Sequence, residues 1–324
     1  MKKITALLCA VLMLLSLAAC GEKDPGTSDE AKDTYVVGIC QLTQHEALDA
    51  ATQGFIDVLT ETFGDKVTIE NKNASNESAN CATIVDGFVT QGVDLILANA
   101  TPALQAAAAK TSDIPILGTA VTEYGVALDI DGFGGTVGGN ISGTSDLAPL
   151  TQQAEMVTEL CPEAKNVGIL YCSGEANSVY QADVVKAELE KAGLTVKVYT
   201  FADTNDVAAV TTTACNENDA LYIPTDNTAA SCTEAINNVA LPAGVPIIAG
   251  EEGIVKGCGL ASLSISYYEL GRTTGEMAVK ILKGEADIST MPIEYYPNPV
   301  KKYNATLAQA LNITIPEGYE PIAE

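Results

Sequence analysis

The chain carries one pattern of residues twice, and this repeat constrains the fold more than any other feature of the sequence. Three runs recur at similar offsets: 37–39 (Val-Gly-Ile) returns at 167–169, 130 positions later; the run from Asp94 returns from Asp219, 125 positions later; and the run from Ile114 returns from Val245, 131 positions later. Offsets that agree this closely indicate two copies of one topology.

Each copy alternates short apolar runs with amphipathic stretches, a pattern typical of strands and helices in turn. Continuous apolar strands indicate parallel sheets with helices on both faces. We therefore predict an α/β fold of two Rossmann-like lobes, each with a parallel sheet, joined by a hinge. The expected strands are 35–40, 67–71, 94–97 and 115–117, then 166–171, 194–199, 220–223 and 246–248; the expected helices are 46–62, 77–91 and 101–110, then 177–192, 205–215 and 226–239.

A glycine-rich segment lies between the two copies, with six glycines at 132–143. Such a run is expected at a hinge or in an active-site loop. It does not match the G-x-G-x-x-G spacing of a dinucleotide site. We expect the hinge crossings near 139–143 and 260–266, with the last part of the chain shared between the lobes. The predicted boundaries are 34–140 and 265–290 for the first lobe, and 141–264 and 291–324 for the second.

The N-terminal residues have the form of an export signal. Two lysines precede an apolar run at 4–17, which is shorter than a membrane-spanning helix needs and ends in Leu-Ala-Ala-Cys20. This ending resembles a bacterial lipobox, in which the cysteine is acylated; the alternative is an ordinary secretory signal with an incidental cysteine. We predict a signal peptide at 1–19, a lipid on Cys20 that anchors the protein to the membrane outside the cytoplasm, and a polar tether at 20–33.

Composition excludes several classes of function. The net charge of −25 would repel a phosphate backbone, so nucleic acid is not an expected partner. The chain has one histidine and no C-x-x-C, nucleophile-elbow, Walker or H-E-x-x-H motif. We expect no enzyme activity, no cofactor, no metal site and a monomer. Seven cysteines remain after Cys9 and Cys20; the sequence leaves open whether any of them pair.

Polar residues gather where the predicted strands end and helices begin, which is where open parallel sheets bind ligands. The candidate ligand-binding residues are Gln41, His45, Thr101, Ser145, Asp146, Glu175, Asn177, Ser178, Thr225, Asp226, Asn227 and Glu251. Helix N-termini suit a carboxylate, and acidic side chains suit an ammonium, so a small zwitterion is the expected ligand. At any single turn, helix capping is the alternative explanation.

Within this set we predict separate roles for the two charges of an amino acid. Asp226 is the first candidate for the ligand ammonium, because it follows a strand and opens a helix. Ser145, Asn177, Ser178 and Thr225 are assigned to the ligand carboxylate. The competing interpretation is that Asp226 only caps its helix.

Several motifs together resemble the ABC transporter substrate-binding proteins of the tryptophan/tyrosine type. They are 38–42 (GICQL), 45–49 (HEALD), 143–147 (GTSDL), 173–178 (SGEANS), 224–227 (PTDN) and 267–271 (YYELG). The resemblance implies a type I periplasmic-binding-protein fold, import through an ABC permease and its ATPase, and an aromatic amino acid as ligand. Tyr124, Phe133 and Tyr180 are the candidates to wall an aromatic side chain. A sensing lipoprotein of the same fold, or a receptor for a sugar or nucleoside, stays open as an alternative.

Overall fold

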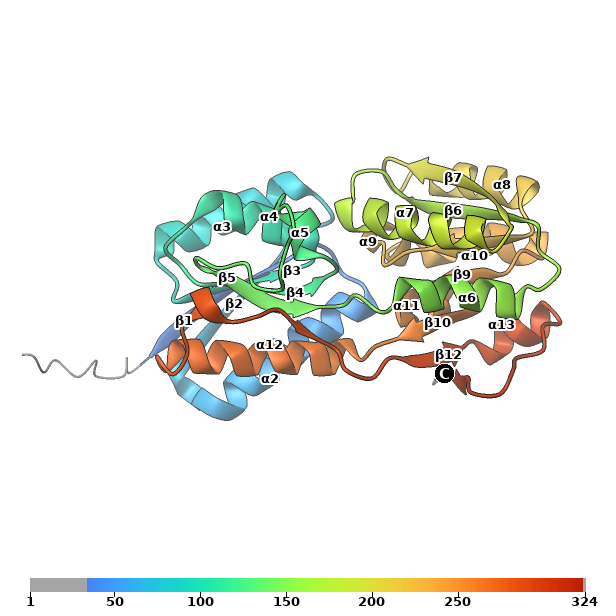
Figure 1. Ribbon diagram of the computed structural model, residues 1–324. Helices are drawn as coiled ribbons and strands as arrows, with labels where there is room; N and C mark the ends of the chain where they lie inside the picture. Colours follow the sequence, from blue (N-terminus) through green and yellow to red (C-terminus); the bar gives the residue numbers. More distant parts are fainter. Residues whose placement is uncertain (1–33, 323–324) are drawn as a thin grey trace, which may run out of the picture. The chain divides into compact units, whose positions relative to one another are not determined.

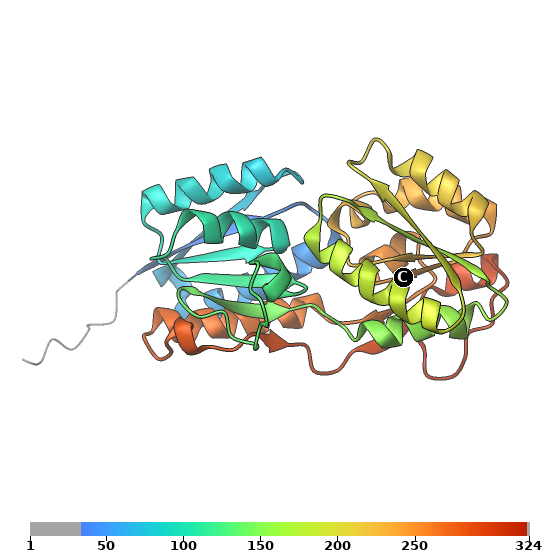
Figure 2. The same ribbon diagram turned by 45° about the horizontal axis from the view of Figure 1, so that its top comes forward.

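The computed structural model describes residues 34–322, which form two sheets with helices on both faces (Figures 1 and 2). The first sheet has six strands in the order β11-β5-β4-β3-β1-β2, and every pairing in it is parallel. Its strands are β1 (Tyr35–Gln41), β2 (Val67–Asn73), β3 (Leu95–Asn99), β4 (Ile116–Val121), β5 (Ile141–Ser145) and β11 (Glu294–Tyr295).

The second sheet has seven strands in the order β13-β12-β10-β9-β8-β6-β7. Its pairings are parallel except for the antiparallel pair β10–β12. Its strands are β6 (Asn166–Cys172), β7 (Thr195–Phe201), β8 (Ala220–Ile223), β9 (Ile247–Ala249), β10 (Ala261–Ser264), β12 (Val300–Tyr303) and β13 (Glu320–Pro321). We call each sheet with its helices the first lobe and the second lobe.

Helices cover both faces of each sheet (Figure 2). In the first lobe these are α2 (Glu46–Phe63), α3 (Ser78–Gln91), α4 (Thr101–Lys110), α5 (Tyr124–Ala127) and α12 (Tyr267–Leu282), with 3-10 turns η1 (Gly64–Lys66) and η2 (Ile288–Thr290). In the second lobe they are α6 (Leu150–Leu160), α7 (Ala176–Lys191), α8 (Val207–Glu217), α9 (Asn227–Ala230), α10 (Thr233–Ala243), α11 (Glu252–Gly257) and α13 (Ala305–Ala310). No helix in this described part is long and apolar enough to cross a membrane.

The predicted two-lobed α/β class is confirmed, and most predicted elements lie within two residues of the observed ones. The expected helix at 226–239 is instead two helices, α9 and α10, because the chain leaves helical geometry at Cys232, which has φ −125° and ψ 20°. The predicted signal peptide, lipid site and tether lie outside the described residues.

The lobe boundaries differ from the prediction at two strands. Both β5 and β11 belong to the first sheet, although 141–145 and 294–295 were assigned to the second lobe. The glycine pattern concealed β5. A Cβ on Gly143, which has φ +146°, would lie 2.1 Å from the Gly118 carbonyl oxygen, so this glycine permits close strand packing.

The chain passes between the lobes three times, through 146–149, 265–266 and 296–299 (Figure 1). The second crossing falls inside the predicted segment 260–266. The first crossing follows β5, so the chain crosses at 146–149 and not at the predicted 139–143. Asp146 therefore lies on a crossing segment.

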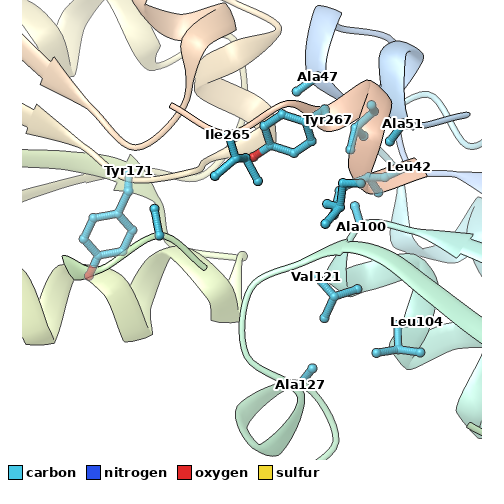
Figure 3. Close-up of a cluster of buried hydrophobic side chains, with 14 of the residues drawn as sticks. Leu42, Ala47, Ala51, Ala100, Leu104, Val121, Ala127, Tyr171, Ile265 and Tyr267 are labelled. Atoms are coloured by element: carbon cyan, nitrogen blue, oxygen red, sulfur yellow. The ribbon is translucent and has the colours of Figure 1, made fainter. Parts of the chain in front are cut away.

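Glycines let α2 and α12 pack closely on one face of the first sheet. A Cβ on Gly271 would lie 2.0 Å from the Ala51 carbonyl oxygen, and one on Gly54 would lie 2.1 Å from that of Tyr268. Ala51 and Ala47 of α2 lie near Tyr267, the first residue of α12, in a buried apolar cluster (Figure 3). This packing places the N-terminal ends of both helices side by side, next to the cavity described below.

Candidate functional site

A small cavity lies where the carboxyl ends of both sheets meet. Its lining residues are His45, Leu48, Ala120, Thr122, Asp146, Asn177, Thr225, Asp226, Asn227, Ala230, Glu251 and Tyr267. Residues from both lobes and from the first crossing segment contribute, so the cavity lies between the lobes. Three of the lining residues carry a carboxylate, and no lysine or arginine lines the cavity.

Glu175, just behind the cavity, organises the second-lobe wall. Its carboxylate is 4% exposed and accepts hydrogen bonds from the backbone N–H of Asn227 (2.9 Å) and of Thr228 (2.9 Å). It also accepts from the Asn227 Nδ2 (2.6 Å), the Thr228 hydroxyl (2.8 Å) and the Asn177 Nδ2 (3.3 Å). Both oxygens are therefore committed to the protein, and Glu175 positions neighbouring residues instead of lining the cavity.

Asp226 is tied to three elements of the second lobe. Its Oδ1 accepts from the Ala229 backbone N–H at 2.7 Å and so caps α9. Its Oδ2 accepts from the Cys172 backbone N–H at 2.7 Å and from the Ser178 hydroxyl at 2.8 Å. Burial and the nearby Glu175 carboxylate raise the pKa of Asp226. Helix capping accounts for the Oδ1 contact alone. The two Oδ2 contacts connect Asp226, which follows β8, to the end of β6 and the start of α7.

Glu251 has a similar capping geometry at the start of α11. Its two carboxylate oxygens accept from the backbone N–H groups of Gly253 and Ile254, each at 2.6 Å. Burial raises the pKa of Glu251 to about 7.

His45, from the first lobe, reaches across to the second. Its Nε2 lies 3.2 Å from the Asn227 Oδ1. Because the Asn227 amide nitrogen donates to Glu175, the Asn227 oxygen is the acceptor and the His45 Nε2 carries the proton. Burial lowers the pKa of His45, so the ring is neutral and its Nδ1 is an acceptor. That Nδ1 is buried without a hydrogen-bond partner.

Asp146 stands apart from the other two carboxylates of the cavity. Its Oδ2 accepts from the Tyr267 hydroxyl at 2.9 Å, while its Oδ1 is buried with no hydrogen-bond partner. Burial raises the pKa of Asp146, against the opposing effect of the Tyr267 and Thr122 hydroxyls. The Asn177 Oδ1 is also unpartnered. Of the six buried unpartnered side-chain atoms in residues 34–322, three belong to residues of this cavity.

The lobes also touch directly around the cavity. The Asn76 Nδ2 donates to the Thr228 hydroxyl at 3.0 Å, and the Thr122 and Thr225 hydroxyls are 3.3 Å apart. At the surface, Lys256 pairs with Glu46 at 2.9 Å. With the His45–Asn227 contact, these interactions join the two lobes at four points.

The cavity thus contains seven of the twelve predicted residues: His45, Asp146, Asn177, Thr225, Asp226, Asn227 and Glu251. The other five are Gln41, Thr101, Ser145, Glu175 and Ser178. Gln41 accepts from Thr52 and donates to Asp49, inside the first lobe. Thr101 is buried at the start of α4. Ser145 donates to the Thr122 carbonyl at 2.7 Å and accepts from the Leu147 N–H, so its hydroxyl is committed to the crossing segment.

Sequence reasoning missed five lining residues: Leu48, Ala120, Thr122, Ala230 and Tyr267. Tyr267 had a usable signal, because it directly follows a crossing segment and opens a helix. None of the predicted aromatic wall residues Tyr124, Phe133 and Tyr180 lines this cavity. Tyr124 is 1% exposed, and its hydroxyl donates to the Thr144 carbonyl inside the first lobe.

Comparison with known proteins gives consistent matches over nearly all of the described chain. The family model of ABC transporter substrate binding proteins matches residues 36–322. A tyrosine-binding protein of Clostridioides difficile (strain R20291) is 36% identical over 305 residues, which are 90% of this chain and 87% of the relative.

Two solved structures with the same sequence identity to this chain differ in how well they superpose on it. A Streptococcus pneumonia ABC domain in complex with L-Trp is 35% identical, covers 89% of this chain and 100% of its own, and has a TM-score of 0.84. The ligand-free, open structure of a substrate binding protein with adhesive properties from Clostridium difficile is also 35% identical, with coverage of 89% and 99%, but has a TM-score of 0.68. The chain therefore superposes better on the ligand-bound relative.

The fold, the cavity between two lobes and these matches agree with one another. Proteins of the matched family bind small ligands outside the cytoplasm for ABC transporters. The recognised resemblance and the type I periplasmic-binding-protein fold are both confirmed. This chain belongs to the family of ABC transporter substrate-binding proteins.

Proposed function

We propose that the protein captures a free aromatic amino acid between its lobes and delivers it to an ABC permease and its ATPase. The observation that carries this proposal is the chemistry of the cavity: three carboxylates line it, no lysine or arginine does, and three acceptor atoms are buried there without partners. Buried acceptors without donors are costly, and a cationic ligand would satisfy them. A neutral sugar would not balance the negative charge.

The ligand's own carboxylate has suitable partners at two helix ends. The N-terminal ends of α2 and α7 adjoin the cavity at His45 and Asn177, and neither helix has a side-chain cap. The first N–H groups of an uncapped helix, together with its dipole, favour an anion. By contrast, Asp226 and Glu251 cap α9 and α11. Uncapped helix ends and carboxylates in one cavity favour a zwitterion.

The aromatic side chain is inferred from the relatives and one ring of this chain. The relatives include a tyrosine-binding protein and a complex with L-Trp. Tyr267, with Leu48 and Ala230, provides an apolar surface in the cavity. We therefore expect tyrosine or tryptophan to bind more tightly than small or charged amino acids.

A ligand screen tests this proposal. Thermal unfolding would be measured with each of the twenty amino acids, simple sugars and nucleosides, followed by calorimetric titration of every hit. A ligand that binds only the folded state adds about 2.7 kcal/mol of stability at a hundredfold excess over its Kd. We expect the aromatic amino acids to give the largest stabilisation. Stabilisation by a sugar or nucleoside alone would refute the proposal.

The membrane anchor is part of the same proposal. Leu-Ala-Ala-Cys20, after two lysines and an apolar run, supports acylation of Cys20. We expect Cys20→Ala to move the protein from the membrane fraction to the soluble fraction, with unchanged ligand affinity. Membrane association that survives this substitution would exclude the lipid anchor.

A further inference from the structure

The three carboxylates of the cavity differ in how many of their oxygens the protein already uses. Asp226 and Glu251 each accept hydrogen bonds on both oxygens, including backbone N–H groups that cap helices. Asp146 accepts on Oδ2 alone, from Tyr267, and its Oδ1 is buried without a partner. Only Asp146 keeps a whole carboxylate oxygen for a ligand.

Two further unpartnered acceptors line the same cavity. They are the Nδ1 of His45, which is an acceptor in the neutral ring whose Nε2 donates to Asn227, and the Oδ1 of Asn177. The Asn177 amide nitrogen is already used, since it donates to the Thr225 carbonyl at 2.8 Å. A primary ammonium has three N–H donors, the same number as these acceptors, and one of the three acceptors is charged.

We propose that the ligand's ammonium group binds to Asp146, with His45 and Asn177 as its neutral partners, and that Asp226 is a structural residue. This inference rests on the proposed function, because it concerns the same cavity. It replaces the role first predicted for Asp226. The Oδ2 of Asp226 already accepts two donors and its Oδ1 accepts one, so its charge is balanced within the second lobe.

The proposed acceptors come from three separate parts of the molecule. His45 precedes α2 of the first lobe, Asn177 lies in the first turn of α7 of the second lobe, and Asp146 lies on the first crossing segment. Tyr267, which holds the Asp146 Oδ2, directly follows the second crossing segment. One ammonium bound to all three would connect both lobes and the hinge, so its binding would favour closure of the lobes.

The first test compares Asp146→Asn with Asp226→Asn by calorimetric titration with the best amino acid from the screen. In Asp146→Asn the amide oxygen can still accept from Tyr267, and a buried charge is removed. We expect a melting temperature equal to or above wild type and a ten- to hundredfold loss of affinity, as for a lost charge-assisted hydrogen bond. Asp226→Asn would turn an amide N–H toward a backbone donor, so its expected effect is a lower melting temperature.

Asp131→Asn, which replaces an exposed carboxylate, serves as the matched control and should change neither the melting temperature nor the ligand affinity. Near wild-type affinity in a stably folded Asp146→Asn variant would overturn the inference. The same would follow if Asp226→Asn, although stably folded, lost far more affinity than Asp146→Asn.

The second test removes the ammonium from the ligand. For tyrosine, the deaminated analogue is 3-(4-hydroxyphenyl)propanoate. We expect wild type to bind it much more weakly than tyrosine, and Asp146→Asn to bind it as well as wild type does, because the interacting pair is already broken. An equal loss of affinity for both compounds in Asp146→Asn would show that Asp146 acts on another part of the ligand and would refute the inference.

Closure can be measured independently of affinity by small-angle X-ray scattering. At saturation, tyrosine should decrease the radius of gyration of the wild type, whereas the analogue should not. An equal decrease with both compounds would contradict the role of the ammonium in closure. If no amino acid binds at all, the proposed function fails; if an amino acid binds and Asp146→Asn does not weaken it, only this inference fails.

Discussion

The two lobes present their sides of the cavity by different physical means, although they share one topology. The second-lobe wall is built from a buried hydrogen-bond network centred on Glu175 and Asp226, whose four carboxylate oxygens all accept from the protein. The first-lobe wall depends on apolar packing, in which α2 and α12 lie close together and position His45 and Tyr267. The second lobe therefore presents a largely hydrogen-bonded polar surface on which the Asn177 Oδ1 has no partner, and the first lobe adds the unpartnered Nδ1 of His45.

This difference predicts that different kinds of substitution will disrupt the cavity wall in each lobe. Steric changes between helices should damage the first-lobe wall, and loss of a buried charge should damage the second.

The largest effect is expected for Gly271→Ala in the first lobe. The added Cβ would lie 2.0 Å from the Ala51 carbonyl oxygen, so α12 must move away from α2. We expect a loss of about 3 kcal/mol in the free energy of unfolding, at the upper end of typical overpacking costs, and weaker ligand binding because His45 and Tyr267 move apart. Urea unfolding and calorimetry would measure both.

Gly87→Ala in α3 is the matched control, because a Cβ there meets nothing within 4 Å. It should stabilise the protein by roughly 0.5–1 kcal/mol, the helix-propensity difference between alanine and glycine. If Gly271→Ala were as harmless as Gly87→Ala, close helix packing would not be what positions the first-lobe wall.

A somewhat smaller effect is expected for Glu175→Gln in the second lobe. One carboxylate oxygen becomes an NH₂ group that faces N–H and O–H donors of Asn227 or Thr228. We expect a loss of about 2–3 kcal/mol in the free energy of unfolding. Glu188→Gln is the control: Glu188 pairs only at the surface with Lys191, so its loss should cost less than about 1 kcal/mol. Equal costs for the two variants would contradict a special role for the buried network.

The comparison also explains which features could be predicted from sequence. Strand and helix positions followed from hydrophobic periodicity, which depends on burial alone. Strand β5 was missed because Gly143, needed there for close contact with β4, has the same sequence signature as a flexible hinge.

The sequence predicted which turns form the candidate site. It did not predict which side chain of each turn faces the cavity. Residues next to each other at one turn differ in role: Asn177 lines the cavity, while Ser178 donates inward to Asp226. Likewise Ser145 turns back to the Thr122 carbonyl, and Asp146 faces the cavity. Such differences depend on tertiary contacts between distant segments, which no local pattern encodes.

The smallest predicted effect is the change of ligand affinity with pH. Titratable groups on both sides of the cavity contribute to it. Burial raises the pKa values of Asp146 and Asp226, and that of Glu251 to about 7 from an ordinary 4.5, while it lowers the pKa of His45. Without ligand, the contribution of Glu251 to stability is full below pH 4.5 and is lost as the pH rises through about 7.

A bound ammonium favours the ionised carboxylates, so ligand binding should release protons below neutral pH, and affinity should rise with pH between 4.5 and 7. Protonation of His45 at low pH acts in the same direction, because its Nδ1 would become a donor facing the ammonium. Each coupled proton contributes up to tenfold per pH unit, about 1.4 kcal/mol. We expect affinity to be several-fold weaker at pH 5 than at pH 7.5, and Glu251→Gln to flatten the profile in part. Titrations in buffers of different ionisation enthalpy would count the protons released, and a proton uptake on binding would contradict this account of the cavity.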